Sequence, residues 1–235
     1  MGKAVDLLRH TISLPFTGIF YTVTALVCVF VSTNYIDILH GLQKAESIGE
    51  INLRALAGWL VIIFLPHIIN GILLDRCNRI RIFSCVRTKS VSQYNISVYM
   101  TCLMNSCLWG VILWVIHLLV SRVHVFALLF VLVTHIIMWT SVMLLIYALT
   151  NGAAVAFVAA PLICVLSIGF SCSNNSISDY MISCFGMLTR GSLYNGGGLP
   201  PMVQTILNLV ISVVCISLAY IKDGLYGGKR KWKPS

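Results

Sequence analysis

Long runs of apolar residues, separated by short polar stretches, dominate the chain. Six runs approach or exceed the length of about 20 residues that a helix needs to cross a bilayer. They cover residues 16–32, 55–74, 96–120, 125–149, 152–171 and 202–221. Stretches such as VILWVIHLLV and FALLFVLV lack the apolar–polar alternation of a membrane-spanning β-barrel. The pattern predicts an all-α, polytopic membrane protein with six transmembrane helices in a single transmembrane domain, residues 1–235.

The composition agrees with this prediction. Hydrophobic residues make up 58% of the 235 residues and charged residues 10%, against about 45–50% and about 25% in soluble domains. So few charges cannot cover a water-soluble body of this size, and so hydrophobic a chain is not disordered. The formal net charge of +9 is the usual result of basic residues beside cytoplasmic helix ends. Nucleic-acid binding is not expected, because the basic stretches lack aromatic stacking platforms and a folded binding module.

The segments before, between and after the predicted spans face the two sides of the membrane alternately, and the basic residues are distributed unevenly between these sides. The segments on one side hold twelve of them, and the segments on the other side hold four. The twelve are Lys3, Arg9, Arg76, Arg79, Arg81, Arg87, Lys89, Lys222, Lys229, Arg230, Lys231 and Lys233, and the four are Lys44, Arg54, Arg122 and Arg190. Since the richer set normally faces the cytoplasm, we expect a multi-pass protein of the cell membrane with both termini cytoplasmic.

Two segments on the basic side have a character of their own. Residues 1–13 place Val5, Leu8 and Ile12 on one helical face, which predicts a short amphipathic helix at the membrane interface. Residues 75–95 are the most basic part of the chain and are predicted to form a cytoplasmic loop. The simplest interpretation of that loop is a topological anchor.

The outer segment, residues 172–201, is too polar to span and too apolar in its middle for an ordinary loop. Asp179 is a suitable N-cap for a helix reaching Leu188. Such a helix either dips back into the membrane, where protein must shield irregular backbone, or lies on the outer surface. The candidate residues of a re-entrant helix are Asp179, Phe185, Gly186 and Arg190. A disulfide between Cys172 and Cys184 is one alternative to two buried thiols.

Catalytic and cofactor motifs are missing from the sequence. The six histidines form no HExxH pattern, and no glycine-rich P-loop is present. Histidines and amides within the spans, such as His135 and Asn208, are expected to pair between helices or to line a mildly polar pathway. No predicted span carries an interior Asp, Glu, Lys or Arg, which argues against ion-coupled carriers and most membrane enzymes. We expect no enzyme activity, no metal and no cofactor in this chain.

The order of the segments resembles the permease subunits of type-2 ABC transporters. Three stretches are similar to parts of that family, including small bacterial permeases of peptide antibiotic export and immunity. They are Leu74-Asp75-Arg76-Cys77-Asn78-Arg79 after the second span, Arg87-Thr88-Lys89-Ser90-Val91-Ser92 before the third, and Phe185-Gly186-Met187-Leu188-Thr189-Arg190 before the last. The first carries Asp75 where the family usually has glutamate.

The resemblance implies a function and a set of partners. Residues 75–95 would be a coupling loop in which Asp75, Arg76, Arg79, Arg81 and Arg87 contact a separate ATP-binding cassette subunit, which would hold ATP and magnesium. A second permease chain, identical or different, and membrane lipid would complete the transporter. A path without internal charge suits an amphipathic, peptide or lipid-like cargo. The alternative function is a non-transporting immunity or interaction protein that anchors or sequesters a partner.

Overall fold

The computed structural model describes residues 18–24, 26, 35–42, 52–88, 91–121, 126–173, 178–192 and 198–227. The predicted amphipathic helix at 1–13 lies outside these residues, as does most of the predicted first span at 16–32. The parts of that span that are described, residues 18–24 and 26, are helical.

Five long helices make up the bulk of the described chain, and a short one, α3 (Tyr35–His40), precedes them. They are α4 (Leu53–Thr88), α5 (Val91–Ser121), α6 (Phe126–Thr150), α7 (Ala153–Ser173) and α8 (Pro201–Gly227). All five are long and apolar enough to cross a membrane, and they coincide with the second to sixth predicted spans. The prediction of an all-α, multi-pass membrane protein is therefore confirmed.

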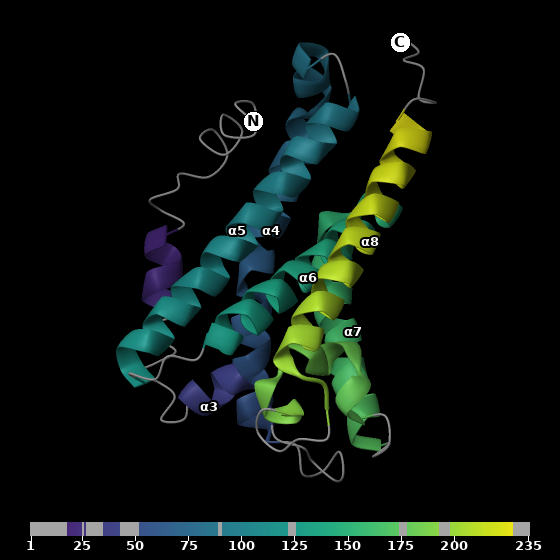
Figure 1. The fold of residues 1–235 in the computed structure, drawn as a ribbon. Coiled ribbons are helices and arrows are strands. Elements are labelled where there is room, and N and C mark those ends of the chain that lie inside the picture. Colours follow the sequence, from purple (N-terminus) through teal and green to yellow (C-terminus); the bar gives the residue numbers. More distant parts are fainter. Residues whose placement is uncertain are drawn as a thin grey trace.

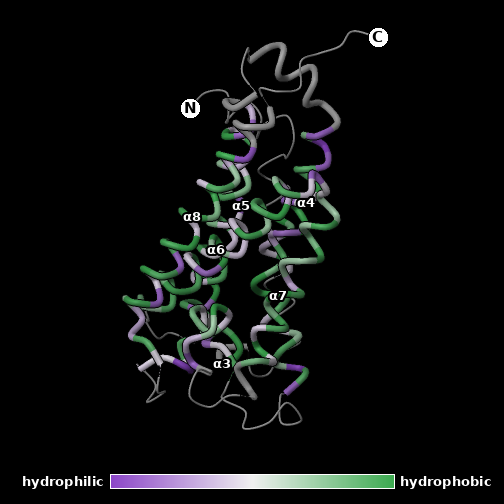
Figure 2. Tube along the Cα trace, turned by 90° about the vertical axis from the view of Figure 1, so that its right-hand side faces the viewer, coloured by the Kyte–Doolittle hydropathy of each residue, from purple (hydrophilic) through white to green (hydrophobic). Residues whose placement is uncertain are grey.

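Helix α6 lies at the centre of the bundle, beside α8 and α5, with α7 and α4 completing its surroundings (Figure 1). Most of its side chains from Leu128 to Ala148 are buried. Hydrophobic residues follow the long helices through most of their length, and hydrophilic residues gather near the helix ends, as on α4 just before its grey part (Figure 2). This distribution is the one expected of helices that cross an apolar layer.

Helix α8 is polar on the side that faces the protein and apolar on the side that faces outward. Gln204, Asn208 and Ser212, spaced four residues apart, are all buried, whereas Val210 and Val213 are more than half exposed. A soluble protein would show the reverse arrangement. In lipid there is no hydrophobic force between helices, so polar side chains turn inward to find hydrogen-bond partners. This inverted pattern is independent support for a membrane environment.

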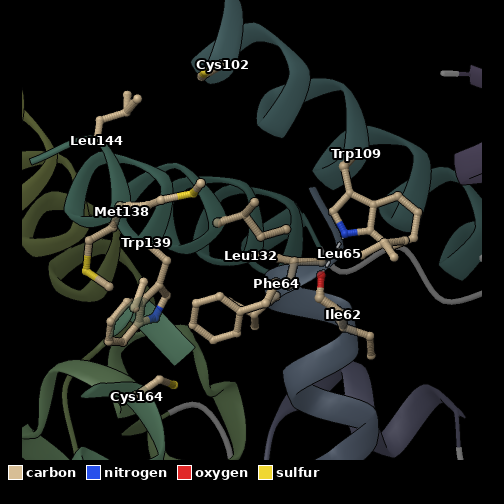
Figure 3. Packing of buried hydrophobic residues seen from close by; sticks show 14 of the residues in the cluster. Ile62, Phe64, Leu65, Cys102, Trp109, Leu132, Met138, Trp139, Leu144 and Cys164 are labelled. Carbon is tan, nitrogen blue, oxygen red and sulfur yellow. Dashed lines mark hydrogen bonds between the residues drawn. The ribbon is translucent and has the colours of Figure 1, made fainter. Parts of the chain in front are cut away.

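A proline inside α4 is compensated by a tryptophan of α5. Pro66 has no N–H, so it cannot bond to the carbonyl of Ile62, four residues earlier. The indole Nε1 of Trp109 donates a hydrogen bond of 2.6 Å to that carbonyl oxygen, as Figure 3 shows. Trp109 is fully buried. The bond satisfies a backbone acceptor that would otherwise remain unpaired within the membrane.

The connection between α6 and α7 is the tight turn expected at Thr150-Asn151-Gly152. Asn151 adopts a left-handed conformation with φ of 56°, which asparagine tolerates better than most residues. Its N–H bonds to the carbonyl of Tyr147 at 2.7 Å, and the N–H of Gly152 bonds to Thr150 Oγ1 at 3.3 Å. The two helices therefore form a closely connected hairpin.

The segment predicted as a loop from Asp75 to Asn95 is mostly helical. Helix α4 runs without interruption to Thr88, and α5 begins at Val91. The prediction of a loop was wrong because it ended the helix where the apolar residues end. Arginine and isoleucine, which recur in this segment, are good or adequate helix formers, and a helix can leave the membrane without unwinding.

Candidate functional site

The charged residues at the end of the second span border a crevice between α4 and α7. Its volume is about 490 Å³, and its lining includes Ile68, Ile72, Asp75 and Arg76 from α4 and Ala154 and Phe157 from α7. Asp75 and Arg76 are exposed at its charged end. The crevice exists because Gly71, Ala153 and Ala154, which also line it, are too small to fill the space between the two helices.

The other three residues of the predicted coupling set lie farther along the same helix. Arg79, Arg81 and Arg87 belong to the part of α4 that follows Asn78, where the candidate membrane span ends. Their side chains are outside the described part of the structure. The structure thus brings Asp75 and Arg76 together at the crevice, and places the three later arginines on the helical extension, residues 79–88.

The base of the helical extension is fastened to α5. Tyr94 Oη donates a hydrogen bond of 2.7 Å to the carbonyl oxygen of Cys77. Both residues are buried. The bond holds the start of the α5 span against the end of the α4 span, so the extension leaves the bundle from a fixed point.

At the opposite end, the outer segment folds back among the helices. It forms three short 3-10 turns, η2 (Ser178–Tyr180), η3 (Ile182–Gly186) and η4 (Leu188–Arg190). The turn η3 packs against α6, α7 and α8. Cys184, Met187 and Leu188 are completely buried. Of the two alternatives, a segment that dips into the bundle agrees with this burial, and a helix on the outer surface does not.

The α-helix predicted from Asp179 to Leu188 is not formed, and Asp179 is not its cap. The carboxylate of Asp179 instead lies 3.6 Å from the guanidinium of Arg190. Both side chains are buried, with 9% and 3% of their surface exposed. The prediction failed because the capping pattern is local, whereas the charge that draws Asp179 inward lies eleven residues later in the chain.

Arg190 also connects the outer segment to the end of α3. Its Nε donates a 3.2 Å hydrogen bond to the carbonyl oxygen of Leu42, and Thr189 Oγ1 donates another of 3.0 Å to the same atom. The preceding Gly41 has φ of 106° and packs directly against Met187, so a side chain there would meet both backbone strain and a steric clash. These contacts join two parts of the chain that are far apart in sequence.

Gly186 touches the ring of His135 in the middle of α6. An added Cβ at Gly186 would overlap three atoms of the imidazole. His135 is the tenth residue of α6, about 14 Å along a helix that rises 1.5 Å per residue. The outer segment therefore reaches roughly halfway along the central helix.

His135 is held in place by two hydrogen bonds. Trp139 Nε1 donates to His135 Nε2 at 3.0 Å, and His135 Nδ1 lies 3.2 Å from Asn208 Oδ1. An indole N–H only donates, so Nε2 accepts and Nδ1 carries the proton that it donates to Asn208. The amide of Asn208 donates in turn to the carbonyl oxygen of Phe185 at 3.1 Å. The prediction that this histidine pairs between helices is confirmed.

A second polar network joins α4, α5 and α6 nearer the basic end. Asn105 accepts from Tyr21 Oη at 3.0 Å and donates to Asn70 Oδ1 at 2.8 Å. Asn70 donates to Ser106 Oγ at 3.1 Å, and Ser106 lies 2.7 Å from Thr140 Oγ1. These buried groups satisfy one another, so they pack the helices together rather than line an open channel.

A histidine pair is the feature that the sequence did not reveal. The rings of His40, at the end of α3, and His117, on α5, are 5.4 Å apart. Their sequence separation gives no periodic signal, so only the tertiary fold brings them together. Among the described residues, no group of three His, Cys, Asp or Glu side chains is arranged to hold a metal ion. Cys184 forms no disulfide.

No family model, curated protein or solved structure matches this chain. What the fold and the hydropathy of its helices establish is a multi-pass helical membrane protein with five candidate spans in its described part. The two polar ends of the bundle, one bearing the crevice and the helical extension and the other the buried outer segment, are the candidate functional regions.

Proposed function

We propose that this chain is the permease subunit of an ATP-driven ABC transporter. The observation that carries the proposal is the helical extension of α4. Its ten residues, 79–88, continue the helix past the span that ends at Asn78 and reach about 15 Å beyond it at 1.5 Å per residue. The extension carries Arg79, Arg81 and Arg87 and turns back into α5 at Val91. A rigid basic protrusion of this kind suits docking to a separate ATP-hydrolysing subunit.

The buried outer segment supports the same function. A re-entrant segment before the last span belongs to the segment order that resembles type-2 ABC permeases. Here the turn η3 lies against α6, α7 and α8. The interior is apolar, and the buried amides of Asn70, Asn105 and Asn208 bond to groups of the protein, which suits an amphipathic, peptide or lipid-like cargo more than an ion. The transporter would contain a second permease chain and an ATP-binding cassette subunit.

Loss of the arginines on the extension should separate the permease from its ATPase. The test purifies this chain from its native membrane and measures how much of an ATP-binding cassette subunit is recovered with it. Removing one partner of a charge-assisted interface contact costs about 2–5 kcal/mol. We therefore expect the double variant Arg79→Ala, Arg81→Ala to retain less than about a tenth of the ATPase on purification. ATP hydrolysis by the purified assembly should fall in parallel.

The matched variants separate docking from membrane anchoring. Arg79→Lys, Arg81→Lys keeps the charge but loses the planar, bidentate guanidinium, so it should still insert correctly and yet bind the ATPase weakly. Arg54→Ala, at the opposite end of α4, should behave as wild type. Full ATPase recovery with the correctly inserted double alanine variant would refute the docking role and favour the alternative of a non-transporting interaction or immunity protein.

We also propose that both termini face the cytoplasm. In chains with a single introduced cysteine and the native cysteines replaced, a membrane-impermeant thiol reagent added to intact cells should label position 47 or 176. It should label position 90 only after the membrane is opened. The expectation follows from the excess of basic residues on one side. Labelling of position 90 in intact cells would reverse the orientation.

A further inference from the structure

The histidine pair of α3 and α5 lies at the end of the bundle that carries the buried outer segment. The ring centres of His40 and His117 are 5.4 Å apart, and the ring planes are inclined by 52°. His117 is 1% exposed and lies just before the end of the α5 span at Leu119, whereas His40 is partly exposed. The pair is therefore close to the edge of the membrane, and its most open side is the α3 side.

The separation of the two rings is the one that a shared metal ion requires. A zinc ion bound at about 2.0–2.1 Å from an imidazole nitrogen is about 3.2 Å from the centre of that ring. Two ring centres at this distance from one ion and 5.4 Å from each other subtend an angle of about 115° at the ion, close to the tetrahedral angle of about 109°. The two imidazoles have the spacing of two ligands of one ion.

The chemistry of the pair selects the kind of ion. Imidazole suits zinc, copper, nickel and iron, whereas magnesium and calcium take oxygen ligands. His40 Nε2 and His117 Nδ1 are both buried, and a metal binds to either kind of ring nitrogen. Both residues also have other interactions. These are compatible with metal binding, because a metal-bound histidine uses the lone pair of one nitrogen and donates its N–H to a neighbouring group.

The charges described around the pair do not exclude a cation. Arg190 reaches the carbonyl oxygen of Leu42, which follows shortly after His40, but its charge is balanced by Asp179 at 3.6 Å. Arg54, in the first turn of α4, is exposed, so solvent and salt screen its charge. The described residues therefore oppose an ion at the pair with little net repulsion.

We propose that His40 and His117 together bind a divalent transition-metal ion of the zinc type, with water completing its coordination. The sequence-based expectation of no metal came from residue spacing, and these two histidines are brought together only by the tertiary fold. Two protein ligands, instead of the four of a structural zinc site, give an exchangeable ion with a dissociation constant on the order of 10 µM. The binding does not depend on the proposed transport function, because it uses no residue of the helical extension.

The ion connects the contact between α3 and α5 to the buried outer segment. Gly41 packs against Met187, and the carbonyl oxygen of Leu42 accepts a hydrogen bond from Arg190 Nε. A metal that fixes His40 against α5 also fixes the two residues that follow it. Since a ligand that binds one arrangement stabilises that arrangement, the ion holds the outer segment in its buried position.

Isothermal titration calorimetry of the whole chain in detergent, after a chelator has removed any bound metal, tests the proposal. Zn²⁺ should bind at a single site with the expected affinity, and Mg²⁺ should not compete. Binding should weaken as the pH falls toward about 5, because histidine binds a metal only in its neutral form. Hydrogen exchange over residues 187–192 should slow when the site is saturated with Zn²⁺.

Variants of the two histidines assign the site. His40→Gln and His117→Gln should each weaken Zn²⁺ binding by at least about tenfold, the lower limit for loss of a residue that merely supports a metal ligand. The double variant should bind no more weakly than the weaker single variant, because both histidines hold the same ion. His10→Gln, in the segment predicted on the opposite side of the membrane, is the control. Circular dichroism and a monodisperse elution profile confirm folding, and His117→Asn replaces His117→Gln if that chain aggregates.

Several results would overturn the proposal. A wild-type chain that binds Zn²⁺ no more tightly than about 1 mM has no such site. Undiminished binding in either folded single variant would place the ion elsewhere, and independent losses in the two variants would indicate two ions. Equal binding of Mg²⁺ would mean that imidazole is not the ligand. Zn²⁺ binding with unchanged exchange over residues 187–192 would separate the ion from the outer segment.

Discussion

Replacing Arg190 by methionine should lower the free energy of unfolding by about 3–5 kcal/mol, the usual cost of leaving one partner of a buried ion pair uncompensated. The guanidinium lies 3.6 Å from the carboxylate of Asp179, and both side chains are at least nine-tenths buried. The variant also loses the hydrogen bond from Arg190 Nε to the carbonyl oxygen of Leu42. Titration with sodium dodecyl sulfate in mixed micelles, followed by tryptophan fluorescence, measures the change.

A double-mutant cycle isolates the ion pair from the other contacts of Arg190. Asp179→Asn should be destabilising alone, and Asp179→Asn combined with Arg190→Met should cost clearly less than the sum of the two single changes. Arg54→Met, at an exposed position of α4, should change stability by less than about 0.5 kcal/mol. Additive single effects would show that the two charges do not interact across the outer segment.

Gly186→Ala should be strongly destabilising for the addition of a single methyl group. The new Cβ would overlap the His135 ring, and that ring cannot retreat easily because Trp139 and Asn208 hold both of its nitrogens. Overpacking of a well-filled core typically costs about 1–3 kcal/mol, and we expect the upper end of that range. The expected result is a lower unfolding midpoint and faster hydrogen exchange over residues 182–190.

Two further variants make the Gly186 result specific. Gly169→Ala in α7 places its Cβ in open space, and alanine is a better helix former than glycine by about 1 kcal/mol, so this change should be neutral or stabilising. Combining Gly186→Ala with His135→Ala should recover part of the loss, since the truncated side chain makes room for the methyl group. If Gly186→Ala unfolds at the wild-type midpoint, the outer segment does not approach α6 as closely as the structure places it.

The spans could be predicted because their signal is local and strong. In lipid, a run of about 20 apolar residues has few alternatives to a membrane-spanning helix. The turn at Asn151 and Gly152 separates two such runs, so the boundary between α6 and α7 could be predicted as well. The helical extension of α4 was missed for the same reason, since hydropathy marks where a helix leaves the membrane and says nothing about where the helix ends. The pairing of His135 with a neighbouring helix was expected from its polarity within an apolar run.

The conformation and the contacts of the outer segment could not be predicted from its own residues. Asp179 has a local capping preference, but its partner Arg190 and the carbonyl of Leu42 are brought to the same place only by the packed helices. Gly186 and Met187 likewise owe their environment to α6 and to Gly41. The resemblance to a permease predicted a re-entrant segment, which stays a prediction, and the contacts that bury residues 182–190 against the helices became visible only in three dimensions.

The bond from Trp109 to Ile62 bears on the mechanics of α4. A proline normally makes a helix bend easily, and α4 continues 22 residues beyond Pro66 to Thr88, an arm of about 33 Å at 1.5 Å per residue. A swing of about 10° at Pro66 would move the far end of that arm by about 6 Å. Because the indole of α5 occupies the carbonyl freed by the proline, a bend that moves Ile62 away from α5 must break a buried bond. Together with the bond from Tyr94 to Cys77, it fastens α4 to α5 on both sides of Pro66, so a motion that starts at Thr88 should move the two helices as a pair.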